Sequence, residues 1–213
     1  MPKRRHRDQV DKSSRYTQYL FKNLRHDKGK STVHQQRTFL AICLDSGDTL
    51  VDEGTEIKDE QEVVQRAALI PGATELVKTL KAWGYPLALV ADGPVGSFEN
   101  ILAQHGLRAY FDAFAISGEV GVSKPDARMF HHALTQLGIA PADYGRVIMV
   151  GNNLERDIKG ANALGIVSVW LDWAPRRAKI PADASEQPQY TIKLPLDLLS
   201  LLKQLEDENQ PTN

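Results

Sequence analysis

The chain has 213 residues, of which 42% are hydrophobic and 25% charged, a composition typical of a globular protein with one substantial core. The net charge of −1 indicates no charged partner for the molecule as a whole, and the single cysteine, Cys43, cannot form an internal disulfide. No apolar run approaches membrane-spanning length, and no apolar segment follows the positive charges at the amino terminus. These features exclude a disulfide-stabilised scaffold, predict no membrane association, and favour a cytoplasmic enzyme or binding protein.

The first segment, residues 1–38, is strongly basic. It holds eleven Lys and Arg against three Asp, a charge of +8, which leaves −9 for the rest of the chain. Tyr16, Leu20 and Leu24 recur at helical spacing and predict a short amphipathic helix. We interpret the segment mainly as a solvated extension; the alternative, given less weight, is an arm that binds nucleic acid or an acidic partner.

The next segment, 39–44, is apolar and predicts a buried strand. This strand ends at Asp45, and a turn begins at Ser46-Gly47. A carboxylate at the carboxyl end of such a strand lies where α/β folds place ligands, and it can act as a nucleophile or a metal ligand. The alternative is that Asp45 and Asp48 only cap a turn.

Strands and helices then alternate along the chain. After an expected short helix through Val63, Val64 and Ala67, helices are predicted near 72–83, 96–105, 126–137, 154–164 and 196–205, and strands near 87–91, 111–116, 147–150, 166–171 and 190–192. This order predicts an α/β fold with a doubly wound parallel sheet in a domain over 39–207, followed by a polar tail, 208–213. The carboxyl ends of parallel strands share one edge, so Asp45, Asp92, Lys124, Asn152 and Asp157 should converge there.

An aspartate, a lysine and a second polar cluster suit attack on a phosphoryl group. The aspartate would form an aspartyl-phosphate, and the lysine and a divalent cation would neutralise the phosphoryl oxygens. Mg²⁺ keeps several waters, so it needs few protein ligands.

Three motifs carry a resemblance to a known family. They are 45–51 with Asp45 and Thr49, 121–126 with Lys124-Pro125-Asp126, and 150–161 with Asp157. In order and spacing, over residues 39–172, they resemble the haloacid dehalogenase-like hydrolase superfamily. The resemblance implies a Rossmann-like core and a Mg²⁺-dependent phosphatase.

The resemblance also implies a role for each matching residue. Asp45 would be the nucleophile and a Mg²⁺ ligand, with the Gly47 carbonyl as a second ligand. Thr49 would orient the loop and contribute to phosphate binding, and Lys124 would hold the charges of nucleophile and phosphate together. Asp157 and Asn152 would complete the metal site.

The sequence departs from the family pattern at three positions. Gly47 stands where the phosphatases usually carry the aspartate that protonates the leaving group; Asp48 substitutes only if the turn rotates it inward. Ala91 replaces a hydroxyl residue that binds phosphate, which leaves the backbone N–H groups of Asp92-Gly93 as candidates. Asn152 replaces an acid and would coordinate Mg²⁺ without charge.

The connections are too short for a sizeable cap domain, since only 21 residues separate Thr49 from Pro71. An open site suits a large substrate, or one that a partner or the basic arm covers. We therefore predict a Mg²⁺-dependent phosphohydrolase acting through phospho-Asp45 on an unidentified phosphorylated substrate. The alternatives are a metal-independent dehalogenase, with Asp45 attacking carbon, and a weakly active binding protein with a basic arm.

The remaining charged and aromatic residues near the predicted site are given structural interpretations. We expect Asp52, Glu53, Glu56 and Asp59 to form a solvated face from which one carboxylate could approach the metal. We interpret Arg176-Arg177 as part of a solvated loop; the alternative, given less weight, is that the pair meets an acidic substrate. Trp170 and Trp173 are expected to pack against the carboxy-terminal loop.

Overall fold

The computed structural model describes residues 37–208. The predicted helix around Tyr16–Leu24 lies outside this range, and the proposed basic extension and polar tail therefore stay predictions. Among the described residues, no helix combines the length and the apolar character needed to cross a bilayer.

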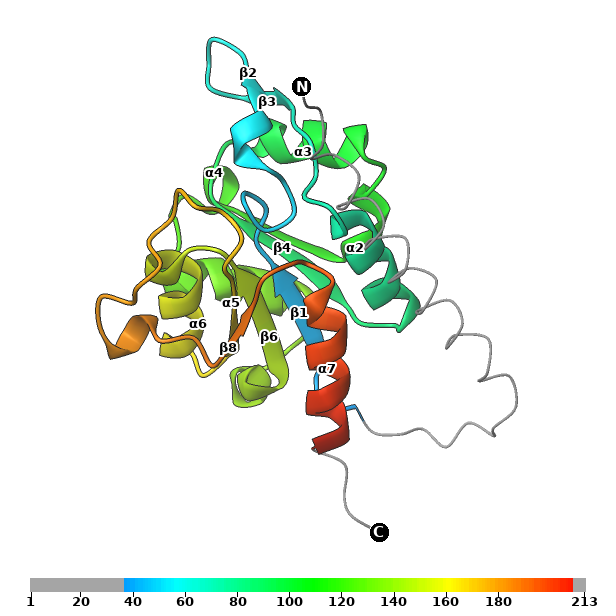
Figure 1. Ribbon diagram of the computed structural model, residues 1–213, viewed down its shortest axis with the longest axis vertical. Helices are drawn as coiled ribbons and strands as arrows, with labels where there is room; N and C mark the ends of the chain where they lie inside the picture. The colour runs from blue at the N-terminus through cyan, green and yellow to red at the C-terminus, as the bar shows by residue number, and fades with distance from the viewer. Residues whose placement is uncertain (1–36, 209–213) are drawn as a thin grey trace, which may run out of the picture. The chain divides into compact units, whose positions relative to one another are not determined.

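A six-stranded sheet forms the centre of the described part (Figure 1). Its strands are β1 (Ala41–Leu44), β4 (Leu87–Ala91), β5 (Ala113–Ile116), β6 (Val147–Gly151), β7 (Val167–Leu171) and β8 (Tyr190–Ile192). The order is β5-β4-β1-β6-β7-β8, and every pairing is parallel. The predicted doubly wound parallel sheet is confirmed, with β1 between β4 and β6.

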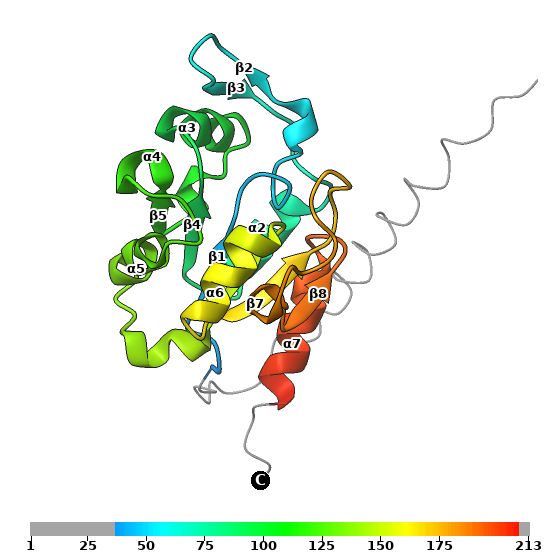
Figure 2. The same ribbon diagram turned by 90° about the vertical axis from the view of Figure 1, so that its left-hand side faces the viewer.

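Helices connect the strands and cover both faces of the sheet (Figures 1 and 2). They are α2 (Ala73–Ala82), α3 (Val95–Gln104), α4 (Ser117–Val120), α5 (Ala127–Gln136), α6 (Lys159–Ala163) and α7 (Asp197–Glu208). Shorter 3₁₀ turns occur at Glu53–Thr55, Arg108–Tyr110, Pro141–Arg146 and Ala184–Glu186, and a π-helical turn at Leu154–Ile158 leads into α6.

Alternate side chains of β1 enter two different cores. Ile42 and Leu44 pack in the larger core with the apolar faces of α2, α3 and α7, whereas Cys43 packs in the smaller core with α5 and α6. This alternation is the period of two that a strand imposes. Each fully buried aliphatic side chain stabilises the fold by roughly 1.5–3 kcal/mol, so β1 is fixed from both sides.

The helix expected at residues 63–67 is wrong. Val64–Arg66 is a strand, β3, which pairs antiparallel with β2 (Ile57–Lys58). Val64 is buried: its N–H donates to Ser97 Oγ at 2.9 Å, and its carbonyl accepts from Asn100 Nδ2 at 3.0 Å. These contacts with α3 hold the backbone extended, and the segment between β1 and α2 holds this small hairpin rather than a cap domain.

Candidate active site

A buried lysine joins two of the motifs at the carboxyl edge of the sheet. Lys124 Nζ lies 2.7 Å from Asp45 Oδ1 and 2.7 Å from Asp157 Oδ1, and it donates to the Val90 carbonyl at 2.7 Å. Asp45, Lys124 and Asp157 are 8%, 4% and 1% exposed. Three charges shielded from water in this way interact more strongly than they would at the surface.

The electrostatics of this cluster follow from burial and proximity. Burial alone would lower the pKa of Lys124, but the carboxylates of Asp157 and Asp45 outweigh it and hold the pKa above its usual value. Burial and the charge of Asp45 raise the pKa of Asp157, against the opposing effect of Lys124. With both carboxyl groups ionised, the cluster carries one excess negative charge, which a cation beside them would balance.

Asp157 is placed by the π-helical turn and by a glycine. The Asn153 N–H donates to Asp157 Oδ2 at 3.0 Å, and the Asp157 N–H returns to the Asn153 carbonyl at 2.9 Å. A Cβ at Gly151 would lie 2.3 Å from Asp157 Cγ. The carboxylate therefore occupies space that only a glycine at the end of β6 leaves free.

The four predicted metal ligands share one pocket: Asp45, Gly47, Asn152 and Asp157 all line it. Asn152 is 3% exposed, and its Nδ2 is buried with no hydrogen-bond partner among residues 37–208. Asn152 lines the pocket, and an amide oxygen is an acceptor of the kind that Mg²⁺ takes as a ligand. Over the described range, no group of three His, Cys, Asp or Glu side chains is arranged to hold a metal. Two carboxylates, an amide and a carbonyl nevertheless fit Mg²⁺, which takes oxygen ligands and retains water.

The predicted phosphate-binding residues divide into two groups. Ala91, Asp92 and Lys124 line the pocket, and Thr49 Oγ1 lies 3.4 Å from Asp45 Oδ2. The Gly93 N–H instead donates to Ser117 Oγ at 2.9 Å, so it is already used within the fold. Asp92 binds the Lys124 N–H at 3.0 Å and therefore links the second strand to the lysine motif.

Asp48 turns away from this pocket. It is fully buried with a φ of 51°, and Arg176 Nε donates to its Oδ2 at 2.7 Å. Arg176 Nη2 also contacts Asp48 Oδ1, and it reaches Asp52 at 3.0 Å. This pairing engages both carboxylate oxygens of Asp48, and Asp48 does not line the pocket that holds Asp45 and Lys124.

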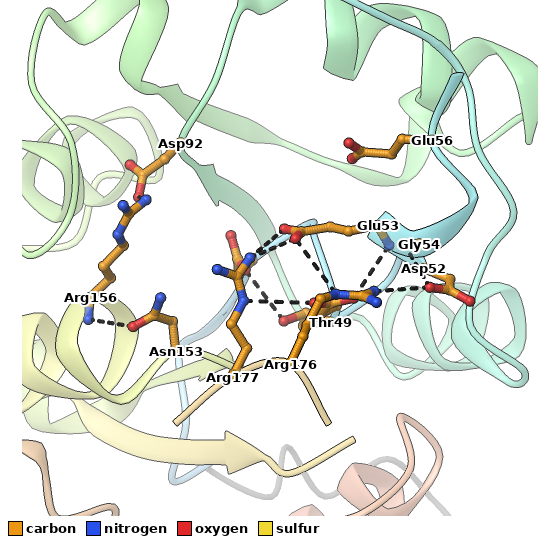
Figure 3. Close-up of polar contacts among 12 residues, drawn as sticks. Thr49, Asp52, Glu53, Gly54, Glu56, Asp92, Asn153, Arg156, Arg176 and Arg177 are labelled. Carbon is orange, nitrogen blue, oxygen red and sulfur yellow. Dashed lines mark hydrogen bonds and ion pairs between the residues drawn. The ribbon is translucent and has the colours of Figure 1, made fainter. Parts of the chain in front are cut away.

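Two charged residues that the sequence predicts to be solvated, Glu53 and Arg177, belong to the site. Glu53 and Arg177 both line the pocket. Arg177 Nη2 donates to Glu53 Oε1 at 2.8 Å and to Oε2 at 2.6 Å, which joins the turn after β1 to the loop after β7 (Figure 3). The interpretation of Arg176-Arg177 as a solvated loop is therefore corrected, because both guanidinium groups hold carboxylates that follow β1.

The environment of Glu53 raises its pKa above the usual value. Burial raises its pKa, Arg177 opposes the rise, and the neighbouring charges of Asp48 and Asp45 add to it, with a net upward shift. A carboxyl group with this balance can hold a proton closer to neutral pH than an exposed glutamate does.

Trp170 does not line the pocket, and its packing partners are only partly those of the predicted carboxy-terminal loop, from which Lys179 Nζ lies 5.6 Å from the centre of the indole ring. Its side chain lies against Leu154 and Ile158, and its indole N–H donates to the Asn152 carbonyl at 3.0 Å. It therefore supports the turn that carries Asn152.

Comparisons with known proteins agree with these motifs. The sequence profile of the haloacid dehalogenase-like hydrolases matches residues 4–165. The phosphoserine phosphatase of Thermus thermophilus is 34% identical over 60% of this chain and 49% of its own length. A glyceraldehyde 3-phosphate phosphatase of Pyrococcus furiosus is 34% identical over 66% of this chain and 55% of its own length. The chain thus spans about half the length of the curated relatives it matches.

Solved structures share the fold. A predicted phosphoglycolate phosphatase from Haemophilus somnus superposes with a TM-score of 0.65 over 78% of this chain and 99% of its own, at 20% identity. A haloacid dehalogenase-like phosphatase from Thermococcus onnurineus superposes with a TM-score of 0.55 over 64% of this chain and 59% of its own, at 27% identity. Because the family profile covers well over half of the sequence, and the parallel sheet and the motif order agree with it, the chain belongs to the haloacid dehalogenase-like hydrolases.

Proposed function

We propose that the protein is a Mg²⁺-dependent phosphohydrolase that acts through an aspartyl-phosphate on Asp45. The observation that carries this proposal is the ion cluster, in which Lys124 holds the Asp45 carboxylate at the end of β1 beside buried Asp157. The curated relatives include phosphatases of phosphoserine, glyceraldehyde 3-phosphate and, in Escherichia coli, pyrimidine nucleotides. Their substrates differ, so the proposal extends to a phosphate monoester of unspecified identity.

The side chains divide the chemistry between them. Asp45 attacks the phosphorus while Lys124 balances negative charge on the nucleophile and on the phosphoryl oxygens. Water then attacks the phosphorus of phospho-Asp45, which releases phosphate and restores the carboxylate. When bound by Asp45, Asp157, Asn152 and the Gly47 carbonyl, Mg²⁺ would supply positive charge that screens the phosphoryl oxygens from the carboxylates.

Hydrolysis of p-nitrophenyl phosphate with Mg²⁺ tests this proposal. We expect turnover by the wild-type protein and a loss of at least about 10³-fold in Asp45→Asn, because the amide cannot act as the nucleophile. Asp143→Asn is a matched control, since the Asp143 side chain lies outside the pocket and forms an exposed ion pair with Arg146 at 3.8 Å. Failure of the folded wild-type protein to turn over any phosphate ester at high enzyme concentration contradicts the proposal.

A metal-independent dehalogenase remains the second candidate. Gly47 and the uncharged Asn152 favour it, because displacement of a halide from carbon needs neither a leaving-group proton nor a cation. The absence of a cap domain between β1 and α2 disfavours it, since nothing in that segment encloses a small apolar substrate. Halide release from a 2-haloacid would favour this candidate over the first if the activity persists in the presence of a chelator.

A further inference from the structure

The space left by Gly47 is filled by another carboxyl group. A Cβ at Gly47 would lie 2.0 Å from Glu53 Oε1 and 2.8 Å from Glu53 Cδ. A side chain at 47 and the observed Glu53 therefore cannot coexist in these positions. The Glu53 carboxyl stands where the first atoms of an aspartate side chain at 47 would stand.

Glu53 is held in this place by its own segment and by a distant loop. It opens the 3₁₀ turn Glu53–Thr55, whose cap is Asp52, and its N–H donates to Asp48 Oδ1 at 3.3 Å. Arg177 fixes the far end of the side chain by contacting both carboxyl oxygens, as Figure 3 shows. The carboxyl is therefore oriented in the pocket that Asp45 and Lys124 also line.

The neighbouring acids are less suited to meet a leaving group there. Asp48 is fully buried against Arg176, and Asp52 also binds Arg176, at 3.0 Å. Glu56 pairs with Lys58 at 3.5 Å, and Figure 3 shows it apart from the arginine pair. Of these four carboxyl groups, only Glu53 lines the pocket.

We propose that Glu53 is the general acid of this enzyme, donating its proton to the oxygen of the leaving group in place of the side chain that Gly47 lacks. The proposal rests on the phosphohydrolase function proposed above. It assigns to Arg177 the role of a positioning residue that also stabilises the carboxylate once the proton has left.

The step balances in atoms and charge. The bond between phosphorus and the leaving oxygen breaks as the Asp45 oxygen bonds to phosphorus, and the Glu53 proton moves to the leaving oxygen, which departs as an alcohol. In the second half, the Glu53 carboxylate takes a proton from the attacking water, and the bond between Asp45 and phosphorus breaks. Phosphate is released with Asp45 ionised and Glu53 protonated again.

A series of leaving groups tests the assignment. In Glu53→Gln we expect hydrolysis of an alkyl phosphate to fall by about 10²–10⁴, because an alkoxide leaves poorly without a proton. Hydrolysis of p-nitrophenyl phosphate should fall by less than about 10-fold, because that phenolate leaves unaided. Glu56→Gln is the matched control and should change neither rate.

A relocation variant provides a second test. Glu53→Ala removes the obstructing carboxyl, and adding Gly47→Asp places one on the neighbouring loop position, whose backbone has no positive φ. We expect the double variant to recover alkyl phosphate hydrolysis relative to Glu53→Ala alone, and Gly47→Asp alone to lose activity through the clash.

The outcomes separate this inference from the function on which it rests. If Glu53→Gln slows alkyl and p-nitrophenyl phosphates equally, or mainly raises the Mg²⁺ concentration required, Glu53 is not the general acid, although the phosphohydrolase stands. If the wild-type protein hydrolyses no phosphate ester, the proposed function and this inference both fail. A selective loss on alkyl phosphates, with recovery in the double variant, supports the assignment.

Discussion

At the residue scale, Lys124 is the residue whose replacement should be most costly. Its side chain is 2% exposed and lies between two carboxylates, both at 2.7 Å. In Lys124→Met these carboxylates face each other without a counter-charge, and such a loss costs about 3–5 kcal/mol. We expect urea unfolding to show a destabilisation of this size.

Lys81→Met is the matched control for this substitution. Lys81 pairs with Asp112, but both side chains are exposed by a third or more. An exposed pair contributes about 0.2–1 kcal/mol. Equal destabilisation by the two substitutions would contradict the described burial of Lys124.

Gly151 offers a second test of the site geometry. In Gly151→Ala the added methyl would lie 2.3 Å from Asp157 Cγ and must displace that carboxylate. We expect a destabilisation of about 1–3 kcal/mol, measured by chemical unfolding, with weakened Mg²⁺ binding measured by calorimetry. Gly145→Ala, whose nearest neighbour would lie at 3.8 Å, should leave both quantities nearly unchanged.

Some residues of this site could be predicted from the sequence, and others could not. Asp45 and Lys124 each lie in a local motif, and the rule that parallel strands end at one edge brings them together. Glu53 and Arg177 carry no such signal, because they meet across 124 residues of sequence. The missing side chain at Gly47 was visible in the sequence, but the group that fills its space depends on how the following turn folds.

At the scale of elements, Glu206 connects α7 to the segment that enters β1. Its carboxylate accepts the N–H groups of Thr38 at 2.8 Å and Phe39 at 3.2 Å, and the Tyr85 hydroxyl at 2.8 Å. Burial alone would raise the pKa of Glu206, but these hydrogen bonds outweigh it and hold the pKa below 4.5. The ionised form therefore stabilises the contact between α7 and the start of β1.

The pH dependence of stability follows from the sign of this shift. A carboxyl group whose pKa is lower in the folded state than in the unfolded state stabilises the fold at pH values above its unfolded-state pKa. This stabilisation is lost as the pH falls through the folded-state pKa. Glu206→Gln should lower the free energy of unfolding by about 1 kcal/mol at pH 7, with the difference from wild type shrinking below pH ~4. Denaturant titrations at several pH values measure this, with exposed Asp207→Asn as the control. A difference that is constant down to pH ~3 would contradict the assignment.

The elements themselves were predictable to different degrees. Strands such as β4 and β6 are uninterrupted apolar runs, and both occur where the sequence predicts them. The hairpin of β2 and β3 was not predicted, because Val63, Val64 and Ala67 also fit a helical spacing. Only the packing of this segment on α3 decides between helix and strand. The helix expected over 154–164 begins as a π-helical turn, in the segment where Asp157 turns toward Lys124.

At the scale of the whole molecule, Cys43 reports on the stability of the entire sheet. It lies unexposed in the central strand, and burial raises its pKa to about 12. Both the steric protection and the raised pKa suppress reaction with a thiol reagent in the folded state. We expect native labelling at least about 10³-fold slower than labelling in urea, since it requires global opening.

The labelling rate should change in step with global stability. Lys124→Met should accelerate it, whereas Lys81→Met should leave it close to wild type. Rapid native labelling, or labelling insensitive to Lys124→Met, would mean that the sheet opens locally around β1 without unfolding of the rest.

The 2.0 Å approach between Glu53 and a Cβ at Gly47 also constrains how this site can diverge in evolution. A relative that acquires aspartate at the position of Gly47 must first lose or reorient the acid at the position of Glu53. Among relatives, acids at these two positions should therefore be mutually exclusive, and an arginine matching Arg177 should accompany the second arrangement. A transition in which the acid at the position of Glu53 is lost first passes through a sequence with neither acid, which would be restricted to substrates whose leaving groups need no proton.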